Sequence, residues 1–109
     1  MSYSRGMSVR SRLDEGQVSQ FLAAHRGWQS TRGELRRTYD FGSFTDSLRF
    51  VNEVAALAER ESHHPDIGLH FRRVTIALLT YEQDGVTSRD TEMAVKIDAL
   101  KANFAKGNS

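Results

Sequence analysis

The stretch AERESHHPDIGL, residues 58–69, contains the point where the chain changes from helix to strand. The residues before it follow helical spacing, whereas His64 precedes the chain's single proline, Pro65, and residues before proline avoid helical backbone angles. A spacing of four places Glu59 beneath His63 on one face of the last helical turn. Two side chains that titrate near neutral pH therefore lie beside a carboxylate, which is the outline of a proton-transfer site. The alternative is structural: one histidine caps the helix, the other lines a turn, and Glu59 is solvated.

The helix before this junction, predicted over residues 44–62, has two apolar stripes. Ser43 lies three residues before Asp46, a capping-box spacing that favours a helix start. The first stripe consists of Phe44, Leu48, Val51, Ala55 and Ala58, and the second, roughly 115° around the axis at 100° per residue, of Phe50, Val54 and Leu57. A helix of a small domain needs one stripe against its sheet, so we expect the second stripe to contact another subunit. The alternative is that the first helix of the domain covers it.

Alternating apolar residues in the segments before and after this helix predict two β-hairpins. The first covers residues 28–31 and 35–41, and the second covers residues 67–70 and 73–81. Arg37 lies on the otherwise apolar side of the first hairpin. We therefore expect it near a sheet edge, with its stem packed and its guanidinium in water.

Helical spacing predicts two further helices. A short one covers residues 13–26, and the last begins near Thr87, which lies three residues before Asp90 in another capping-box spacing. The predicted class is α+β: a four-stranded antiparallel sheet with three helices on one face, in the order α-β-β-α-β-β-α.

Composition limits the chain to one small domain. Its 109 residues, 39% of them hydrophobic, suit a single core. We assign residues 1–12 to a flexible tail and residues 13–106 to the domain. The tail lacks the apolar run of a signal peptide or a membrane span, so no membrane partner is expected.

Charge and residue types exclude several kinds of site. The absence of cysteine excludes disulfides and thiolate zinc sites, and it fits a reducing cytoplasm. His25 and His70 lie at no familiar metal-ligand spacing from the histidine pair, so we expect no metal. With 15 basic and 14 acidic residues, the net charge of +1 provides no electrostatic footprint for direct binding of nucleic acid.

Residues spread over most of the chain support a family resemblance. They are Gly27-Trp28, Phe41, Phe44, Val54-Ala55, Ala58-Glu59, His63-His64-Pro65, Phe71, Thr80, Gly85, Thr87 and Asp90. With its elements in the order given above, the chain resembles the pterin-4a-carbinolamine dehydratases. The resemblance implies the same α+β fold and assembly into dimers or tetramers, often with the second helix at a subunit interface, so we expect a homo-oligomer formed through the second helix or a sheet edge. It also implies loss of water from a 4a-hydroxytetrahydropterin, without metal or cofactor.

The resemblance further implies roles for individual residues. His63 and His64 would be the catalytic proton-transfer pair, and Glu59 and Asp90 would orient them. Positioned acid-base groups typically contribute about 10²–10⁴-fold to a rate. The pterin slot would be shaped by Pro65, Asp66, Ile67, Thr80 and Tyr81.

Tyr81 departs from the family pattern, which has a third histidine immediately after the threonine of the fourth strand. A tyrosine hydroxyl donates a hydrogen bond but is a poor base at neutral pH. Two functions follow from the resemblance. One is a cytoplasmic dehydratase that uses the two remaining histidines. The other is a dehydratase-like protein without catalysis, which binds a protein client as some members do, either as dimerisation cofactors of a transcription factor or as carboxysomal assembly chaperones of Rubisco. The retained His63-His64-Pro65 favours the enzyme.

Overall fold

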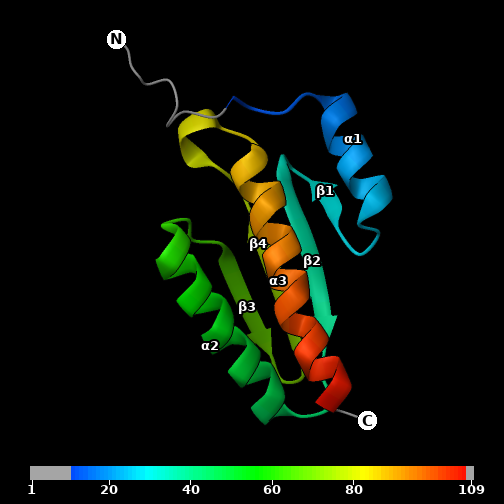
Figure 1. The fold of residues 1–109 in the computed structure, drawn as a ribbon, viewed down its shortest axis with the longest axis vertical. Coiled ribbons are helices and arrows are strands. Elements are labelled where there is room, and N and C mark those ends of the chain that lie inside the picture. The colour runs from blue at the N-terminus through cyan, green and yellow to red at the C-terminus, as the bar shows by residue number, and fades with distance from the viewer. Residues whose placement is uncertain (1–10, 108–109) are drawn as a thin grey trace.

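Figure 1 shows the fold of the chain as a computed structural model, which describes residues 11–107. The elements are, in chain order, α1 (Glu15–Ala24), β1 (Gln29–Thr31), β2 (Glu34–Asp40), α2 (Phe44–Glu61), β3 (Asp66–His70), β4 (Arg73–Leu78), the short 3-10 helix η2 (Tyr81–Gln83) and α3 (Ser88–Gly107). The predicted α+β class and the order α-β-β-α-β-β-α are confirmed, and η2 is an addition to them.

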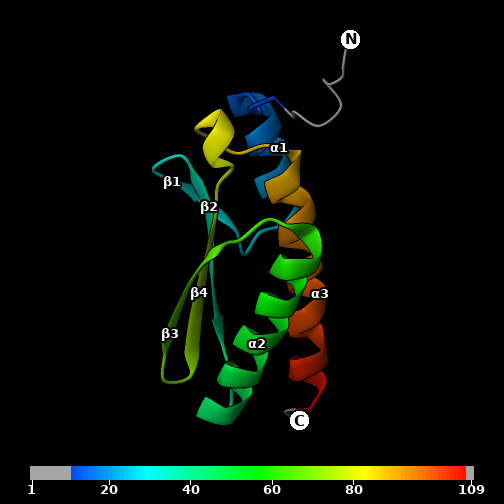
Figure 2. The same cartoon turned by 90° about the vertical axis from the view of Figure 1, so that its left-hand side faces the viewer.

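The four strands form one antiparallel sheet in the order β1-β2-β4-β3, so the two hairpins pair through their second strands. The register of β2 and β4 joins Leu35 with Leu78 at one end and Asp40 with Arg73 at the other. Seen edge-on in Figure 2, all three helices lie on the same face of the sheet, as predicted. The helices and the sheet therefore make two layers with the core between them.

The second apolar stripe of α2, which we expected to contact another subunit, faces the core of the domain. Phe50, Val54 and Leu57 are buried, whereas the first stripe begins with Phe44 and Leu48, which are 46% and 40% exposed. The prediction that the second stripe faces outward is therefore wrong. The physical reason is the neighbouring aromatic cluster: the ring of Phe50 packs against three other rings, with centroid separations of 4.9 to 5.9 Å, and these belong to Tyr39, Phe41 and Phe104.

One carboxylate of α3 ties that helix to the sheet. Asp98 accepts hydrogen bonds from the indole nitrogen of Trp28 at 3.0 Å, from Arg37 at 3.1 Å and from the hydroxyl of Tyr39. The expectation that the guanidinium of Arg37 lies in water at a sheet edge is wrong, because β2 is an interior strand and Asp98 pairs with the arginine. Burial, together with the hydrogen bond to Asp98, raises the pKa of Tyr39 far above its usual value.

The fourth strand is shorter than predicted, since β4 ends at Leu78 and not at Tyr81. Thr80 pairs with Gly85 as an isolated bridge, and the residues between them turn through η2. Asp84 closes that turn with a left-handed backbone, φ 53°. Thr80 and Tyr81 thus lie in a closed loop beyond the sheet, and this loop leads into α3 (Figure 1).

Most of the predicted tail, residues 1–10, lies outside the described residues. Arg12, which the prediction included in the tail, donates a hydrogen bond to the carbonyl of Asp84. Within residues 11–107, no helix combines the length and the apolar character that crossing a membrane requires.

Candidate active site

The site begins where α2 ends. Ser62 follows the helix with a left-handed backbone, φ 52°, and the amide of His63 donates to the carbonyl of Ala58 at 3.2 Å. This pattern is the hydrogen bond of a Schellman helix end. It turns the chain before Pro65 is reached, so His63 leaves the face of α2 that carries Glu59. The expectation that Glu59 lies beneath His63 is therefore wrong.

His63 instead points into the protein, toward the first turn of α3. Its Nε2 lies 2.6 Å from Oδ1 of Asp90, and both side chains are buried. The sequence separation is 27 residues, so only the packing of α2 against α3 brings the two together. The imidazole N–H that donates to this carboxylate fixes the orientation of the ring.

Asp90 is itself held by two further donors. The hydroxyl of Thr80 donates to Oδ2 at 2.7 Å, and the backbone amide of Thr87 donates to the same oxygen at 2.9 Å. The hydroxyls of Thr80 and Thr87 lie 2.8 Å apart, which closes the network. The N-terminus of α3 also favours a negative charge at this position. A buried carboxylate with three donors is thereby placed at the Nε2 edge of the His63 ring.

The predicted capping box at the start of α3 is present in part. Asp90 accepts the backbone amide of Thr87, as that motif requires, but the hydroxyl of Thr87 accepts from the amide of Arg89 and not from that of Asp90. The same carboxylate therefore caps the helix and binds His63.

His64 has a different partner and a different environment. Its Nε2 lies 2.7 Å from Oε2 of Glu59, and the two side chains are 62% and 78% exposed. Each histidine thus has its own carboxylate, one pair buried and one in solvent. The sequence had indicated that the adjacent rings point in different directions, and this is confirmed.

Arg89 is a residue that sequence reasoning missed. Its Nη2 donates to the carbonyl of Ser62 at 2.9 Å, so it bridges the first turn of α3 to the end of α2 next to the histidines. The sequence signal that could have found it was its place beside Asp90. Its role is to satisfy a carbonyl at the C-terminus of α2, as cations near helix ends do.

The residues predicted to form the substrate slot lie in several places. Thr80 belongs to the Asp90 network, and Tyr81 beside it is 67% exposed. Pro65 is half-buried, Asp66 begins β3 in an exposed position, and Ile67 packs against the hydrophobic core. A contact of these side chains with a substrate stays a prediction.

This arrangement can move protons. When Nε2–H of His63 donates to Asp90, the lone pair on Nδ1 can accept a proton, and the buried carboxylate stabilises the imidazolium that forms. His64 lies in solvent, where it can exchange protons with water. Among the residues that the structure describes, no group of three or more His, Cys, Asp or Glu side chains is arranged to hold a metal ion.

Comparison with known proteins finds a matching family model and similar sequences. A sequence model of a protein family, described as Pterin 4 alpha carbinolamine dehydratase, matches residues 11–100. A protein of Thermomicrobium roseum, provisionally named a pterin-4-alpha-carbinolamine dehydratase, is 41% identical over 90 residues, which are 83% of this chain and 97% of that protein. A protein of Sulfolobus acidocaldarius with the same provisional name is 33% identical over 90 residues, 83% of this chain and 99% of that protein.

Two solved structures are similar as well. The crystal structure of a transcriptional coactivator/pterin dehydratase from Brucella melitensis has a TM-score of 0.79 and 34% sequence identity, over 83% of this chain and 98% of that one. A pterin dehydratase-like protein, identified as a RuBisCO assembly factor in the alpha-carboxysome, has a TM-score of 0.57 and 27% identity, over 67% of this chain and 84% of that one.

Proposed function

Because this chain belongs to the pterin-4a-carbinolamine dehydratase family, we propose that it removes water from a 4a-hydroxytetrahydropterin, such as 4a-hydroxytetrahydrobiopterin. In this reaction a base takes a proton from a ring nitrogen while the C4a–O bond breaks, and an acid protonates the departing hydroxyl. The products are a quinonoid dihydropterin and water. Zero cysteines fit a cytoplasmic location for this chemistry.

The observation that supports this proposal is the separate pairing of two adjacent histidines with two carboxylates. His63 is held by the buried Asp90 with Nδ1 left to accept a proton, which suits it to act as the base. His64 is paired with the exposed Glu59 and can exchange protons with water, which suits it to act as the acid. The two functions need different environments, and adjacent residues on the two sides of the turn have them.

We expect Tyr81 to limit how fast such a site works. It occupies the position of the third histidine of the family, and its exposed hydroxyl can donate a hydrogen bond to a bound pterin but is a poor base at neutral pH. We therefore expect a slow dehydratase that depends on His63 and His64 alone.

The test is dehydration of synthetic 4a-hydroxytetrahydropterin, followed by absorbance, with wild type, His63→Ala and Tyr81→His. We expect wild type to exceed the spontaneous rate and His63→Ala to lose the excess, by about 10²-fold or more when proton transfer limits the rate. Tyr81→His is expected to raise kcat. A wild type that is no faster than buffer, with activity gained only in Tyr81→His, contradicts the enzyme assignment.

A second proposed function is that of an assembly chaperone that binds a protein client, and the similarity to the RuBisCO assembly factor supports it. Phe44 and Leu48, the exposed large residues of the first stripe of α2, would give a client protein an apolar surface to bind. Its discriminating test is co-expression with Rubisco subunits: a rise in assembled Rubisco that survives His63→Ala is expected for an assembly chaperone, and the absence of any rise contradicts it.

For the dehydratase, we also propose that the chain forms a homo-oligomer through the same stripe, with a second copy in the place of a client. Phe44 and Leu48 are large apolar side chains at the helix surface, and Val51 and Ala55 continue their line along α2. A surface of this kind is stabilised when a second copy covers it, as in isologous dimers. The resemblance of the sequence to a family that often packs its second helix at a subunit interface supports this choice over a sheet edge.

A further inference from the structure

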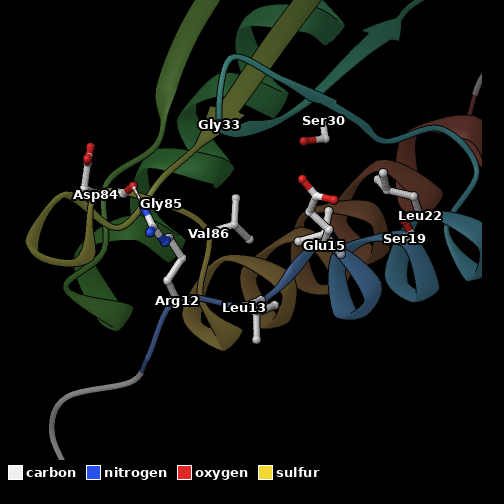
Figure 3. A pocket seen from close by; sticks show the side chains of 11 residues that line it. Arg12, Leu13, Glu15, Ser19, Leu22, Ser30, Gly33, Asp84, Gly85 and Val86 are labelled. Atoms are coloured by element: carbon white, nitrogen blue, oxygen red, sulfur yellow. Dashed lines mark hydrogen bonds between the residues drawn. The ribbon is translucent and has the colours of Figure 1, made fainter.

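The segment before α1 is fastened to the loop that precedes α3. The amide of Leu13 donates to the carbonyl of Val86 at 2.8 Å, and Nη1 of Arg12 donates to the carbonyl of Asp84 at 3.0 Å. Between these two hydrogen bonds the stem of Arg12 lies against Gly85: a Cβ added there would overlap it, and the three nearest atoms are all from Arg12. Figure 3 shows the side chain of Arg12 extending from its own segment to Asp84 and Gly85.

The backbone of Gly85 is also held by Thr80. The amide of Thr80 donates to the carbonyl of Gly85 at 3.0 Å, and the amide of Gly85 lies 3.4 Å from the carbonyl of Thr80. These contacts close the loop that contains Tyr81. The backbone of Gly85 is therefore enclosed between Thr80 and Arg12, and Gly85 itself is buried.

The same loop positions both threonines that hold Asp90. Thr80 lies at one end of the loop and donates its hydroxyl to Oδ2 of Asp90, and Thr87 lies at the other end and donates its backbone amide to the same atom. A displacement of residues 84–86 therefore moves one or both donors away from the carboxylate that orients His63. Val86 and Thr87 are buried and packed, whereas Arg12 is exposed, so the exposed side chain fixes the outer side of a buried network.

We propose that Arg12 is a positioning residue for the pair of His63 and Asp90. It clamps residues 84–86 and so keeps Thr80 and Thr87 in hydrogen-bond range of the carboxylate. The inference rests on the proposed dehydratase function only for its effect on rate, since the hydrogen-bond network can be measured without substrate. A lysine at this position keeps an aliphatic stem over Gly85 and one cationic donor, whereas alanine keeps neither.

The geometry provides a double-mutant test. Gly85 does not use the left-handed backbone region, so the main chain tolerates Gly85→Ala, and the three nearest atoms that the new methyl group would meet all belong to Arg12. Arg12→Ala and Gly85→Ala should then have the same effect, and Gly85→Ala should add nothing in an Arg12→Ala background. Arg36→Ala, which removes an exposed arginine paired with Glu34 on the uncovered face of the sheet, is the control.

The readouts are hydrogen exchange of the Thr87 amide, the tautomer of His63 by nitrogen NMR, and kcat and KM for dehydration. We expect Arg12→Ala to speed exchange of the Thr87 amide about two- to tenfold, the range that corresponds to the net free energy of one hydrogen bond. We expect kcat to fall with KM nearly unchanged, and Arg12→Lys and Arg36→Ala to match wild type.

Three results overturn the proposal, and the first two are unchanged Thr87 exchange in Arg12→Ala and an effect of Gly85→Ala that persists in full when Arg12 is alanine. Equal losses in Arg12→Lys and Arg12→Ala also overturn it, because the clamp needs only the stem and one donor. If wild type has no dehydratase activity, the proposed function fails, while Thr87 exchange and the His63 tautomer still test the clamp.

Discussion

Asp90 is the residue at which folding and the proposed chemistry meet, and its replacement has a calculable effect. Asp90→Ala removes the acceptor of three buried donors, on His63, Thr80 and Thr87. A buried donor left without an acceptor costs about 1–3 kcal/mol, so the three together amount to about 3–9 kcal/mol. A small domain has about 5–15 kcal/mol of stability in total. We therefore expect Asp90→Ala to be largely unfolded or barely stable.

Asp90→Asn separates the carboxylate charge from its shape. An asparagine whose oxygen takes the place of Oδ2 still accepts from Thr80 and Thr87, and its amide nitrogen then faces Nε2 of His63. Because that nitrogen is a donor, His63 must accept with Nε2 and hold its proton on Nδ1. We expect a loss of about 1–3 kcal/mol, with the imidazole in the opposite tautomer and no base available at Nδ1.

Urea unfolding measures both losses through the fluorescence of Trp28, the single tryptophan, and nitrogen NMR reports the tautomer. The control is Asp40, whose ion pair with Arg73 is exposed on both sides; Asp40→Ala and Asp40→Asn should change stability by less than about 1 kcal/mol. A loss of less than about 1 kcal/mol in Asp90→Ala, or a His63 in Asp90→Asn that keeps its proton on Nε2, refutes the reasoning.

Three further predictions test other parts of the molecule. Leu48→Glu places a charge in the exposed stripe of α2 and should convert the proposed oligomer to monomer in light scattering, whereas Ala56→Glu on the polar face of the same helix should not. Since the pKa of Tyr39 is raised, its contribution to stability is complete below its usual value of about 10 and is lost as the pH rises further. Between about pH 9 and about pH 11, the urea midpoint of unfolding should therefore fall more in wild type than in Tyr39→Phe. An equal fall in the two proteins contradicts this. Ser62→Gly should raise stability by about 0.5–1 kcal/mol, because glycine adopts the left-handed backbone at φ 52° without a steric cost; a loss in thermal or urea unfolding counts against the strained turn.

Local patterns in the sequence were sufficient for the fold and insufficient for the pairings within the site. Alternation, helical spacing and capping residues predicted the three α-helices and the four strands, but not η2, and placed the helices on one face. The sequence paired Glu59 with His63, and not with His64, because helical spacing was continued through Ser62. The residue type serine does not predict the left-handed backbone that Ser62 adopts. Which stripe of α2 is buried depends on rings from β2 and α3, and no pattern within one helix contains that information.

In the candidate site, too, some residues could be predicted from the sequence and others could not. His63, His64, Glu59 and Asp90 were identifiable from residue types and from the family resemblance. Arg12 was missed because it lies 72 residues from Asp84 in sequence, and an arginine before a helix has no distinguishing pattern.

Asp90 both caps α3 and binds His63, and this has an evolutionary consequence. Selection for folding alone would retain this aspartate, and Thr80 and Thr87 with it, in a descendant that no longer acts on any pterin. Glu59 and His64 are exposed and free to drift in such a lineage, because their pairing contributes little to stability. Among homologues we therefore expect the exposed pair to be a better marker of a working enzyme than Asp90, because an intact Asp90 marks only a preserved fold.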